Sequence, residues 1–348
     1  MDEKNCEIYE NCLSENNTIV IEEKEKVLHF LAVGCWGVYC DEGEVTIRKK
    51  KKDKIKESKI VRGGQSVKNA LINYTRVNKI TDMYLAGDNV YATKVEGKDD
   101  ISDYDIRNQI SKGFENCINE AEVERFFLSI GNHDIENCDI LSTEFNYTKW
   151  NFPSLYYNVV YEMADFSVNI ICLDTNMFED EPFKCDKSPF TEEEIKTQET
   201  WAIQASRQAS RQASRPASES QNCLWTIVVG HIPYLSNGHK DEKTIVSRAR
   251  LEALIEKIKP DLYICADEHN MQFLKTETGS YIAVCGSGGT ELDQVLEPPP
   301  LEKQTLFQKS AFGFTHYKVS NQGITVKFIS TICKQTCEKL FEYNIVKN

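Results

Sequence analysis

Short apolar runs recur along the chain, and most of them end in a polar turn that contains glycine. Their near-continuous hydrophobicity is typical of strands that are covered on both faces of a sheet. Polar residues gather just after these runs, which predicts a ligand-binding edge at the carboxyl ends of the strands. The six runs are 27–34, 82–88, 125–131, 168–174, 225–230 and 261–266.

Helical spacing fills two of the intervals between these runs. The segments 63–80 and 248–260 are predicted helices, and Pro260 predicts the end of the second one. Three later apolar segments alternate in the manner of antiparallel strands at the end of a sheet. These segments are 281–286, 314–320 and 323–330. Together the patterns predict a layered α/β domain.

Two low-complexity segments interrupt the pattern, at about 43–60 and at 204–220. The first contains a basic run from Arg48 to Lys56, which we interpret as a solvated, mobile insertion rather than a loop that attracts anionic substrate. The second repeats the unit QASR, whose period of four keeps the alanines near one helix face. It also places an arginine three residues before each of three serines, a spacing that basophilic kinases accept, with simple repeat expansion as the alternative. The serines are Ser210, Ser214 and Ser218.

The composition is that of an ordinary globular protein, with 41% hydrophobic and 27% charged residues among 348. A formal net charge of -13 argues against a nucleic-acid partner, because phosphate backbones bind basic surfaces. The 13 cysteines have no paired CxxC spacing, so neither a full disulfide framework nor a zinc finger is predicted. Cys172, Cys265 and Cys285 lie inside apolar runs and are predicted core residues.

We expect residues 1–26 to form an acidic, disordered tail before one domain at 27–348. This tail lacks the apolar core of a signal peptide, and no later segment approaches the roughly 20 apolar residues that a transmembrane helix needs. The compartment is therefore left open: cytoplasmic for the sequence as given, secretory or vesicular if the N-terminus is incomplete. The oligomeric state does not follow from the sequence.

Five groups of potential metal ligands follow the strands in order. They contain four of the six histidines together with carboxylates and a tyrosine. A lone histidine after a strand is usually structural, but four of them at strand ends are much less expected by chance. Such oxygen- and nitrogen-rich groups suit Fe, Zn or Mn, with an aspartate able to bridge two ions. The groups are Gly34–Gly37, Gly87–Tyr91, Gly131–Asp134, Gly230–Pro233 with His239, and Ala266–Asn270.

The order of these groups and the residues in them resemble the metal-binding motifs of the purple acid phosphatases, a branch of the calcineurin-like metallophosphoesterases. The resemblance runs from Val27 to Ile332 and includes Lys149–Ser154 and Leu173–Thr175. It implies a short, single-domain form with an α/β fold, a four-layer α/β/β/α sandwich of two mixed sheets. It also implies an acid phosphatase that hydrolyses phosphate monoesters with a metal-activated hydroxide at a dinuclear site.

The resemblance implies metal ligands at the matching positions. Asp88 would bridge the two metal ions. Tyr91 and His269 would bind Fe(III) at the first site, where the phenolate gives the family its purple colour. Asn132 and His231 would bind Fe, Zn or Mn at the second site.

The resemblance also implies a substrate-binding set. Asn132, His133 and His239 would contact the phosphate of a phosphomonoester substrate. His133 and His239 would be the catalytic residues, because one of them would donate a proton to the leaving alcohol.

Two ligand positions depart from the family pattern. Cys35 stands where the family has an aspartate at the first metal, and it is interpreted either as a thiolate ligand or as an inert buried residue. Asp267 replaces a histidine at the second metal. It is a competent ligand, but its negative charge weakens Lewis acidity and favours hard ions such as Mn or Mg. The alternative to an active enzyme is therefore a catalytically impaired scaffold or binding protein with the same fold.

Overall fold

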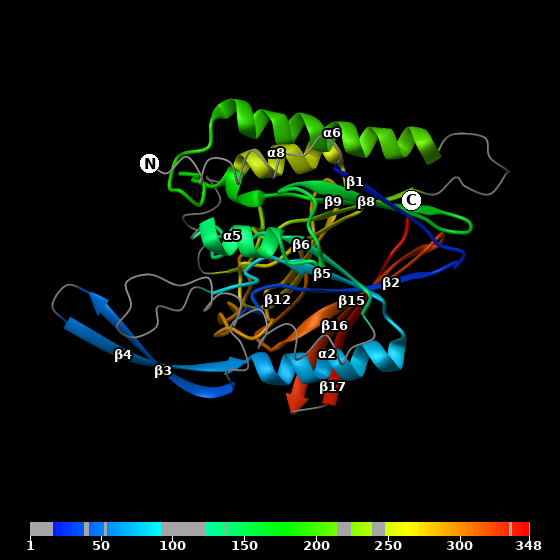
Figure 1. The fold of residues 1–348 in the computed structure, drawn as a ribbon. Coiled ribbons are helices and arrows are strands. Elements are labelled where there is room, and N and C mark those ends of the chain that lie inside the picture. The colour runs from blue at the N-terminus through cyan, green and yellow to red at the C-terminus, as the bar shows by residue number, and fades with distance from the viewer. Residues whose placement is uncertain are drawn as a thin grey trace.

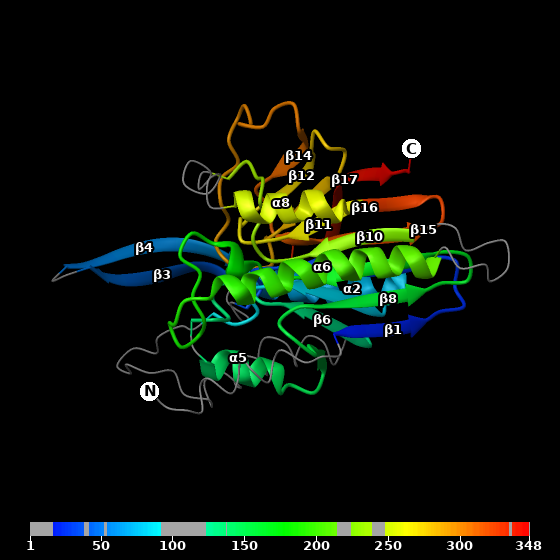
Figure 2. The same cartoon turned by 90° about the horizontal axis from the view of Figure 1, so that it is seen from above.

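The computed structural model describes residues 17–37, 42–51, 54–91, 123–136, 138–213, 224–238, 248–333 and 336–347. Two mixed β-sheets form the centre of the molecule, and helices cover their outer faces (Figures 1 and 2). The four-layer α/β/β/α sandwich that the resemblance implied is confirmed. No helix in the described ranges is both long enough and apolar enough to cross a membrane.

The first sheet has eight strands and a parallel centre. Its strands are β1 (Thr18–Glu22), β8 (Tyr157–Glu162), β9 (Ser167–Cys172), β10 (Leu224–Val229), β11 (Leu262–Cys265), β12 (Met271–Lys275), β13 (Tyr281–Cys285) and β14 (Thr305–Lys309). The order is β1-β8-β9-β10-β11-β13-β12-β14. Strands β9, β10, β11 and β13 run parallel, and β12 is antiparallel to both of its neighbours. The strands of the parallel centre are almost entirely buried and mostly apolar, because both of their faces are covered.

The second sheet has seven strands, half parallel and half antiparallel. Its strands are β2 (Leu28–Val33), β5 (Asp82–Ala86), β6 (Arg125–Ser129), β7 (Trp150–Asn151), β15 (Gly313–Ser320), β16 (Gly323–Cys333) and β17 (Thr336–Ile345). The order is β17-β16-β15-β2-β5-β6-β7. Strands β2, β5, β6 and β7 are parallel, so the loops that follow β2, β5 and β6 leave the same edge of the sheet.

Helices cover the two outer faces of the sandwich. Helices α6 (Glu192–Ala213) and α8 (Ala249–Ile258) lie together over the first sheet, and α2 (Gly64–Asn78) lies under β15, β16 and β17 of the second (Figure 1). The short helix α5 (Cys138–Phe145) and the 3-10 helix η2 (Thr175–Phe178) complete the set used below. The apolar faces of α2 and α8 point inward, as their helical spacing predicted.

Most of the predicted elements are confirmed, and one assignment is corrected. The six apolar runs form β2, β5, β6, β9, β10 and β11, and both predicted helices form α2 and α8. The segment 281–286, however, does not extend an antiparallel end of one sheet. It forms β13, which pairs parallel with β11, whereas β15 and β16 belong to the other sheet. The reason is β12, which turns back at 276–280 and pairs outside β13, so that β13 keeps the direction of β11.

Two further expectations are corrected at the margins. Part of the predicted disordered tail is a strand, because Thr18–Glu22 forms β1 and pairs along β8, and residues 1–16 lie outside the described residues. The segment interpreted as a solvated, mobile insertion has regular backbone structure: β3 (Glu42–Lys51) and β4 (Lys54–Gly63) form an antiparallel ribbon that extends away from the sandwich (Figure 1). Helix α6 continues into the QASR repeat as far as Ala213 and includes the backbone of Ser210. Ser214 and Ser218 lie outside the described residues, and phosphorylation of the repeat stays a prediction.

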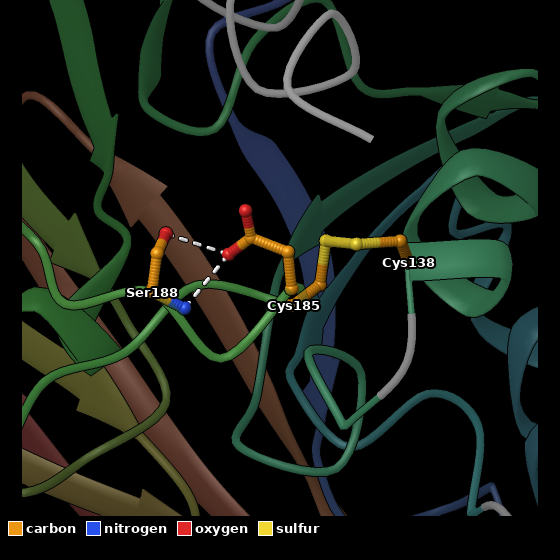
Figure 3. The surroundings of a disulfide bond; sticks show 4 residues. Cys138, Cys185 and Ser188 are labelled. Atoms are coloured by element: carbon orange, nitrogen blue, oxygen red, sulfur yellow. Dashed lines mark hydrogen bonds between the residues drawn. A yellow bond between two sulfur atoms is a disulfide. The ribbon is translucent and has the colours of Figure 1, made fainter. Parts of the chain in front are cut away.

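One disulfide, Cys138–Cys185, is formed within the described residues (Figure 3). It joins the start of α5 to the loop before α6, across a sequence separation of 47. Nearby, the amide and hydroxyl of Ser188 both donate to the carboxylate of Asp186. The three predicted core cysteines are confirmed as free and buried: Cys172, Cys265 and Cys285.

Candidate metal centre

The loops that follow β2, β5 and β6 meet the loops that follow β10, β11 and β13 where the two sheets come together. Backbone hydrogen bonds join them, from the Gly34 amide to the Cys285 oxygen at 3.0 Å and from the Gly288 amide to the Gly34 oxygen at 3.1 Å. This approach needs glycine. A Cβ at Gly34 would stand 2.3 Å from the Cβ of Ala266, and one at Gly87 would stand 2.4 Å from His231 Nδ1.

Three buried side chains from three of these loops form a compact group. Ligand atoms of Cys35, Asp88 and His231 all lie within 4.8 Å of one another, and no other trio of His, Cys, Asp or Glu in the described ranges forms such a group. Cys35, Asp88 and Asp267 also have positive φ angles of 54°, 55° and 61°. Non-glycine residues in this region are strained, and such strain concentrates at functional sites.

The second-metal half of the site gathers around His231. Its Nδ1 donates to the Ala86 oxygen at 2.8 Å, which directs Nε2 into the site. That Nε2 lies 3.1 Å from Asn132 Oδ1, 3.3 Å from Asp88 Oδ1 and 3.9 Å from Asp267 Oδ1. Imidazole, amide and carboxylate groups thus converge, and these are ligand types that suit a divalent cation.

The first-metal half is prepared differently. The Tyr91 hydroxyl donates to Asp88 Oδ2 at 2.8 Å. Burial and then the charge of Asp88 raise the pKa of the Tyr91 phenol well above its usual value, and burial and then Asp88 do the same to the Cys35 thiol. Both groups therefore keep their protons at neutral pH in the absence of a cation. His269, whose backbone amide donates to Asp293 Oδ2 at 2.9 Å, is not part of the compact group.

Asp134 connects the loops of the site through hydrogen bonds to their backbone amides. This buried carboxylate accepts from the amides of Asn89 at 2.8 Å, Val90 at 3.0 Å and Gly131 at 2.7 Å. It therefore links the loop after β5, which carries Asp88, to the loop after β6. Burial and then the charge of Asp88 raise its pKa to about 6, although the donated amides favour its ionised form.

Of the two predicted catalytic histidines, His133 lies within the described residues and His239 does not. His133 donates its backbone amide to Asp88 Oδ1 at 3.1 Å, and its ring lies over that of Tyr91 with centroids 4.4 Å apart. Its Nδ1 is 2.9 Å from Glu136 Oε1. Burial would lower the pKa of His133, but the hydrogen bond to Glu136 and the charge of Asp88 raise it to about 9. His239 lies outside the described residues, so its role stays a prediction.

Two charged neighbours of the site, Arg248 and Glu179, are not apparent from the sequence pattern. Nη2 of Arg248 lies 3.2 Å from Asp267 Oδ2, and the arginine side chain is only 4% exposed. Burial raises the pKa of Glu179, with Arg248 lowering it and Asp267 raising it, which places this carboxyl within electrostatic range of both. Neither residue follows a strand directly, so the pattern of polar groups at strand ends could not find them.

Thr175 also supports the site. Its Oγ1 accepts from the amides of His231 at 3.1 Å and Ile232 at 3.0 Å. It lies in one of the short matching segments noted in the sequence, Leu173–Thr175, and it fixes the backbone that presents the His231 imidazole.

Comparison with known proteins places this geometry in context. The model of the calcineurin-like phosphoesterase family matches residues 28–271, which include all five groups of predicted ligands. Tartrate-resistant acid phosphatase type 5 from mouse (Mus musculus) is 25% identical over 264 residues, covering 70% of this chain and 73% of that protein.

Two solved structures share the fold. GAP50 of Plasmodium, described as the anchor in the inner membrane complex, superposes with a TM-score of 0.63 at 19% identity over 93% of this chain and 90% of that one. The purple acid phosphatase PPD1 from yellow lupin (Lupinus luteus) seeds superposes with a TM-score of 0.61 at 15% identity over 93% of this chain and 54% of that one.

Proposed function

The chain belongs to the calcineurin-like phosphoesterase family, and from this premise we propose that it hydrolyses phosphate monoesters at a metal site built on Asp88, Asn132 and His231. One observation carries the proposal. His231 Nε2 lies 3.1 Å from Asn132 Oδ1 and 3.3 Å from Asp88 Oδ1, so an imidazole, an amide and a carboxylate converge on one point between the loops. Carboxylate, amide and imidazole donors at this spacing suit a divalent ion.

The family generally uses two metal ions, and the two halves of this site fit them unequally. The second half offers Asp88, Asn132, His231 and, on its far side, Asp267. The first half offers Asp88 with a phenol and a thiol, a set that would hold Fe(III) only after both lose their protons. When bound, the metal ions would activate a water molecule and neutralise charge on the phosphoryl group.

The chain's own groups would orient the substrate around these ions. The side-chain amide of Asn132 faces the site and can donate to a phosphate oxygen once its carbonyl is engaged. His133 is next to it, is partly exposed, and is anchored by Glu136 at one ring nitrogen. That position leaves its other nitrogen to give a proton to the leaving alcohol.

A specific observation favours a second function, that of a scaffold without turnover. The Tyr91 hydroxyl donates a hydrogen bond to Asp88, burial raises the pKa of both Tyr91 and Cys35, and the carboxylate that the family places at Cys35 is missing. The fold is also shared with GAP50, the anchor in the inner membrane complex of Plasmodium. A protein that retains the sandwich but loses the first metal would keep a shaped surface for a partner.

Metal content and hydrolysis distinguish the two functions. We expect the purified protein to bind Mn²⁺ and to hydrolyse p-nitrophenyl phosphate with Mn, Zn or Fe supplied. We expect Asp88→Asn to abolish the hydrolysis and to weaken Mn²⁺ binding about 100-fold. Stoichiometric Mn²⁺ binding without turnover in any metal, and without rescue by Cys35→Asp, would favour the scaffold. A visible charge-transfer band with ferric ion would test ligation by Tyr91.

The disulfide bears on the compartment. Disulfides persist in oxidising compartments and are rare in the cytosol, so Cys138–Cys185 favours a secretory or vesicular location. Alkylation of free thiols in intact cells, followed by peptide mapping, should find both cysteines protected until reductant is added. Their labelling without reductant would favour the cytoplasm.

A further inference from the structure

We propose that Arg248 is a positioning residue that cancels the charge of Asp267, so that the second half of the site can hold a divalent ion and a phosphate together. The two groups form a pair in the interior: Arg248 Nη2 is 3.2 Å from Asp267 Oδ2, with side-chain exposures of 4% and 15%. The other oxygen of the same carboxylate, Oδ1, is 3.9 Å from His231 Nε2. Asp267 therefore connects the guanidinium to the metal site.

The net charge around the second half of the site depends on this ion pair. The donors of the second half are two neutral groups, Asn132 and His231, and two carboxylates, Asp88 and Asp267. A divalent ion on two carboxylates sums to zero, which leaves little attraction for an anionic phosphate. The guanidinium of Arg248 restores one positive charge, as if the position of Asp267 were still occupied by a neutral ligand.

The fold fixes Arg248 where this role needs it. The residue caps α8, and its carbonyl accepts from the Glu252 amide at 2.9 Å in the first turn of that helix. Helix α8 packs on η2, which contains Thr175, the residue that anchors the His231 backbone. Among the described residues, Arg248 Nε is buried and has no hydrogen-bond partner, so the guanidinium keeps a donor for an anion. A buried charge with a donor to spare is costly unless a ligand uses it.

The inference deepens the proposed function but is tested without turnover. Isothermal titration calorimetry would measure Mn²⁺ binding and then, at saturating Mn²⁺, binding of inorganic phosphate. Arg248→Gln keeps an amide donor for Asp267 and removes the charge. We expect Mn²⁺ affinity to rise about fivefold to tenfold and phosphate affinity to fall about tenfold, because one positive charge is lost beside both ligands.

Two variants guard against a trivial loss of structure. Arg250→Gln lies on the same helix but removes a guanidinium that pairs with Glu192 and Glu199 at the surface, and it should change neither affinity. Arg248→Lys keeps the charge on a smaller donor. It should keep the wild-type Mn²⁺ affinity and fall between wild type and Arg248→Gln in phosphate affinity.

The pair also predicts an unusual double mutant. Asp267→His restores the family ligand but leaves the Arg248 guanidinium without its carboxylate beside a cation site. We expect this single variant to bind Mn²⁺ about tenfold more weakly than wild type, and Asp267→His with Arg248→Gln to recover the loss.

Each outcome decides the inference. Opposite shifts of the two affinities in Arg248→Gln support it, even if the protein hydrolyses no phosphate ester, in which case only the proposed function fails. Parallel losses, unchanged affinities, or a wild-type protein that binds neither Mn²⁺ nor phosphate would overturn it. Hydrolysis that is unaffected by Arg248→Gln, with unchanged affinities, would leave the proposed function standing and remove this role of Arg248.

Discussion

The two halves of the metal centre share Asp88 but are prepared for different states. In the second half, the His231 imidazole is oriented by the Ala86 carbonyl, and its Nε2 faces oxygens of Asn132 and Asp88. In the first half, the Tyr91 hydroxyl donates a hydrogen bond to Asp88, and the Cys35 thiol is buried with a raised pKa. The second half offers ligands that suit a divalent ion, whereas the first half contains two groups that would have to lose a proton to bind a metal.

The identity of the ligand residues alone does not make a metal site. Cys35 and Tyr91 are competent ligands, but each must lose a proton in a buried place next to a carboxylate. Only an ion of high charge can compensate for that cost. The imidazole, amide and carboxylate around His231 Nε2 suit a divalent ion, so such an ion should bind there first.

The largest effect is expected from the support beneath the second half. Asp134→Ala would leave the buried amides of Asn89, Val90 and Gly131 without their acceptor, which should lower the free energy of unfolding by about 3–5 kcal/mol. Urea denaturation would measure it. The control is Asp186→Ala, which removes an exposed carboxylate and should change stability by about 0.5 kcal/mol or less. Equal effects of the two variants would contradict the support role of Asp134.

The second largest effect is expected from a change at Asp88, the carboxylate that both halves share. Asp88→Asn keeps the shape and tolerates the positive φ of 55°, but removes the charge that both halves use. Mn²⁺ affinity should fall about 100-fold by calorimetry, comparable with the loss of a key ligand partner. Asp180→Asn, at an exposed carboxylate, is the matched control and should bind as wild type. Retained Mn²⁺ affinity in Asp88→Asn would show that the two halves do not share this ligand.

Restoring the missing carboxylate should make the first half of the site a better metal-binding site, more similar to the second half. Cys35→Asp would raise ferric-ion affinity about tenfold and strengthen the visible band of a Tyr91 phenolate complex, because a carboxylate ionises where the thiol does not. The metal-free variant should be less stable, since it places a second carboxylate beside Asp88. Absorbance titration with ferric citrate measures the gain, and adding Tyr91→Phe should remove the band. A band that survives this second change would come from another residue.

The smallest effect concerns the thiol itself. Because Cys35 is fully buried and its pKa is raised, iodoacetamide should leave it unmodified in the native, metal-free protein at pH 7.5. Cys337, which is only partly buried, provides an internal reference that should be labelled first. Peptide mapping by mass spectrometry follows both. Rapid labelling of Cys35 would mean that its half of the site is open to solvent and holds a thiolate.

Much of the fold was accessible from local pattern. Apolar runs of strand length identified the parallel strands, because burial on both faces makes nearly every residue of such a strand apolar. Helical spacing of apolar residues in two segments identified α2 and α8, because burial of one helix face repeats every three to four residues. The parallel pairing of β13 was missed because the same apolar run fits either direction. Strand β1 was missed because its alternation, TIVIE, lies inside an acidic stretch.

The amino-acid sequence shows which donors stand at the strand ends and that two of them, Cys35 and Asp267, depart from the family pattern. Three contacts are visible only in the folded chain: Arg248 pairs with Asp267 across 19 residues, Asp134 links the loops after β5 and β6, and Cys138 bonds to Cys185. These contacts join residues that are far apart in the sequence. Periodicity and turns report on neighbours a few residues apart, whereas the charge balance of the site depends on groups that meet only after both sheets and α8 have packed.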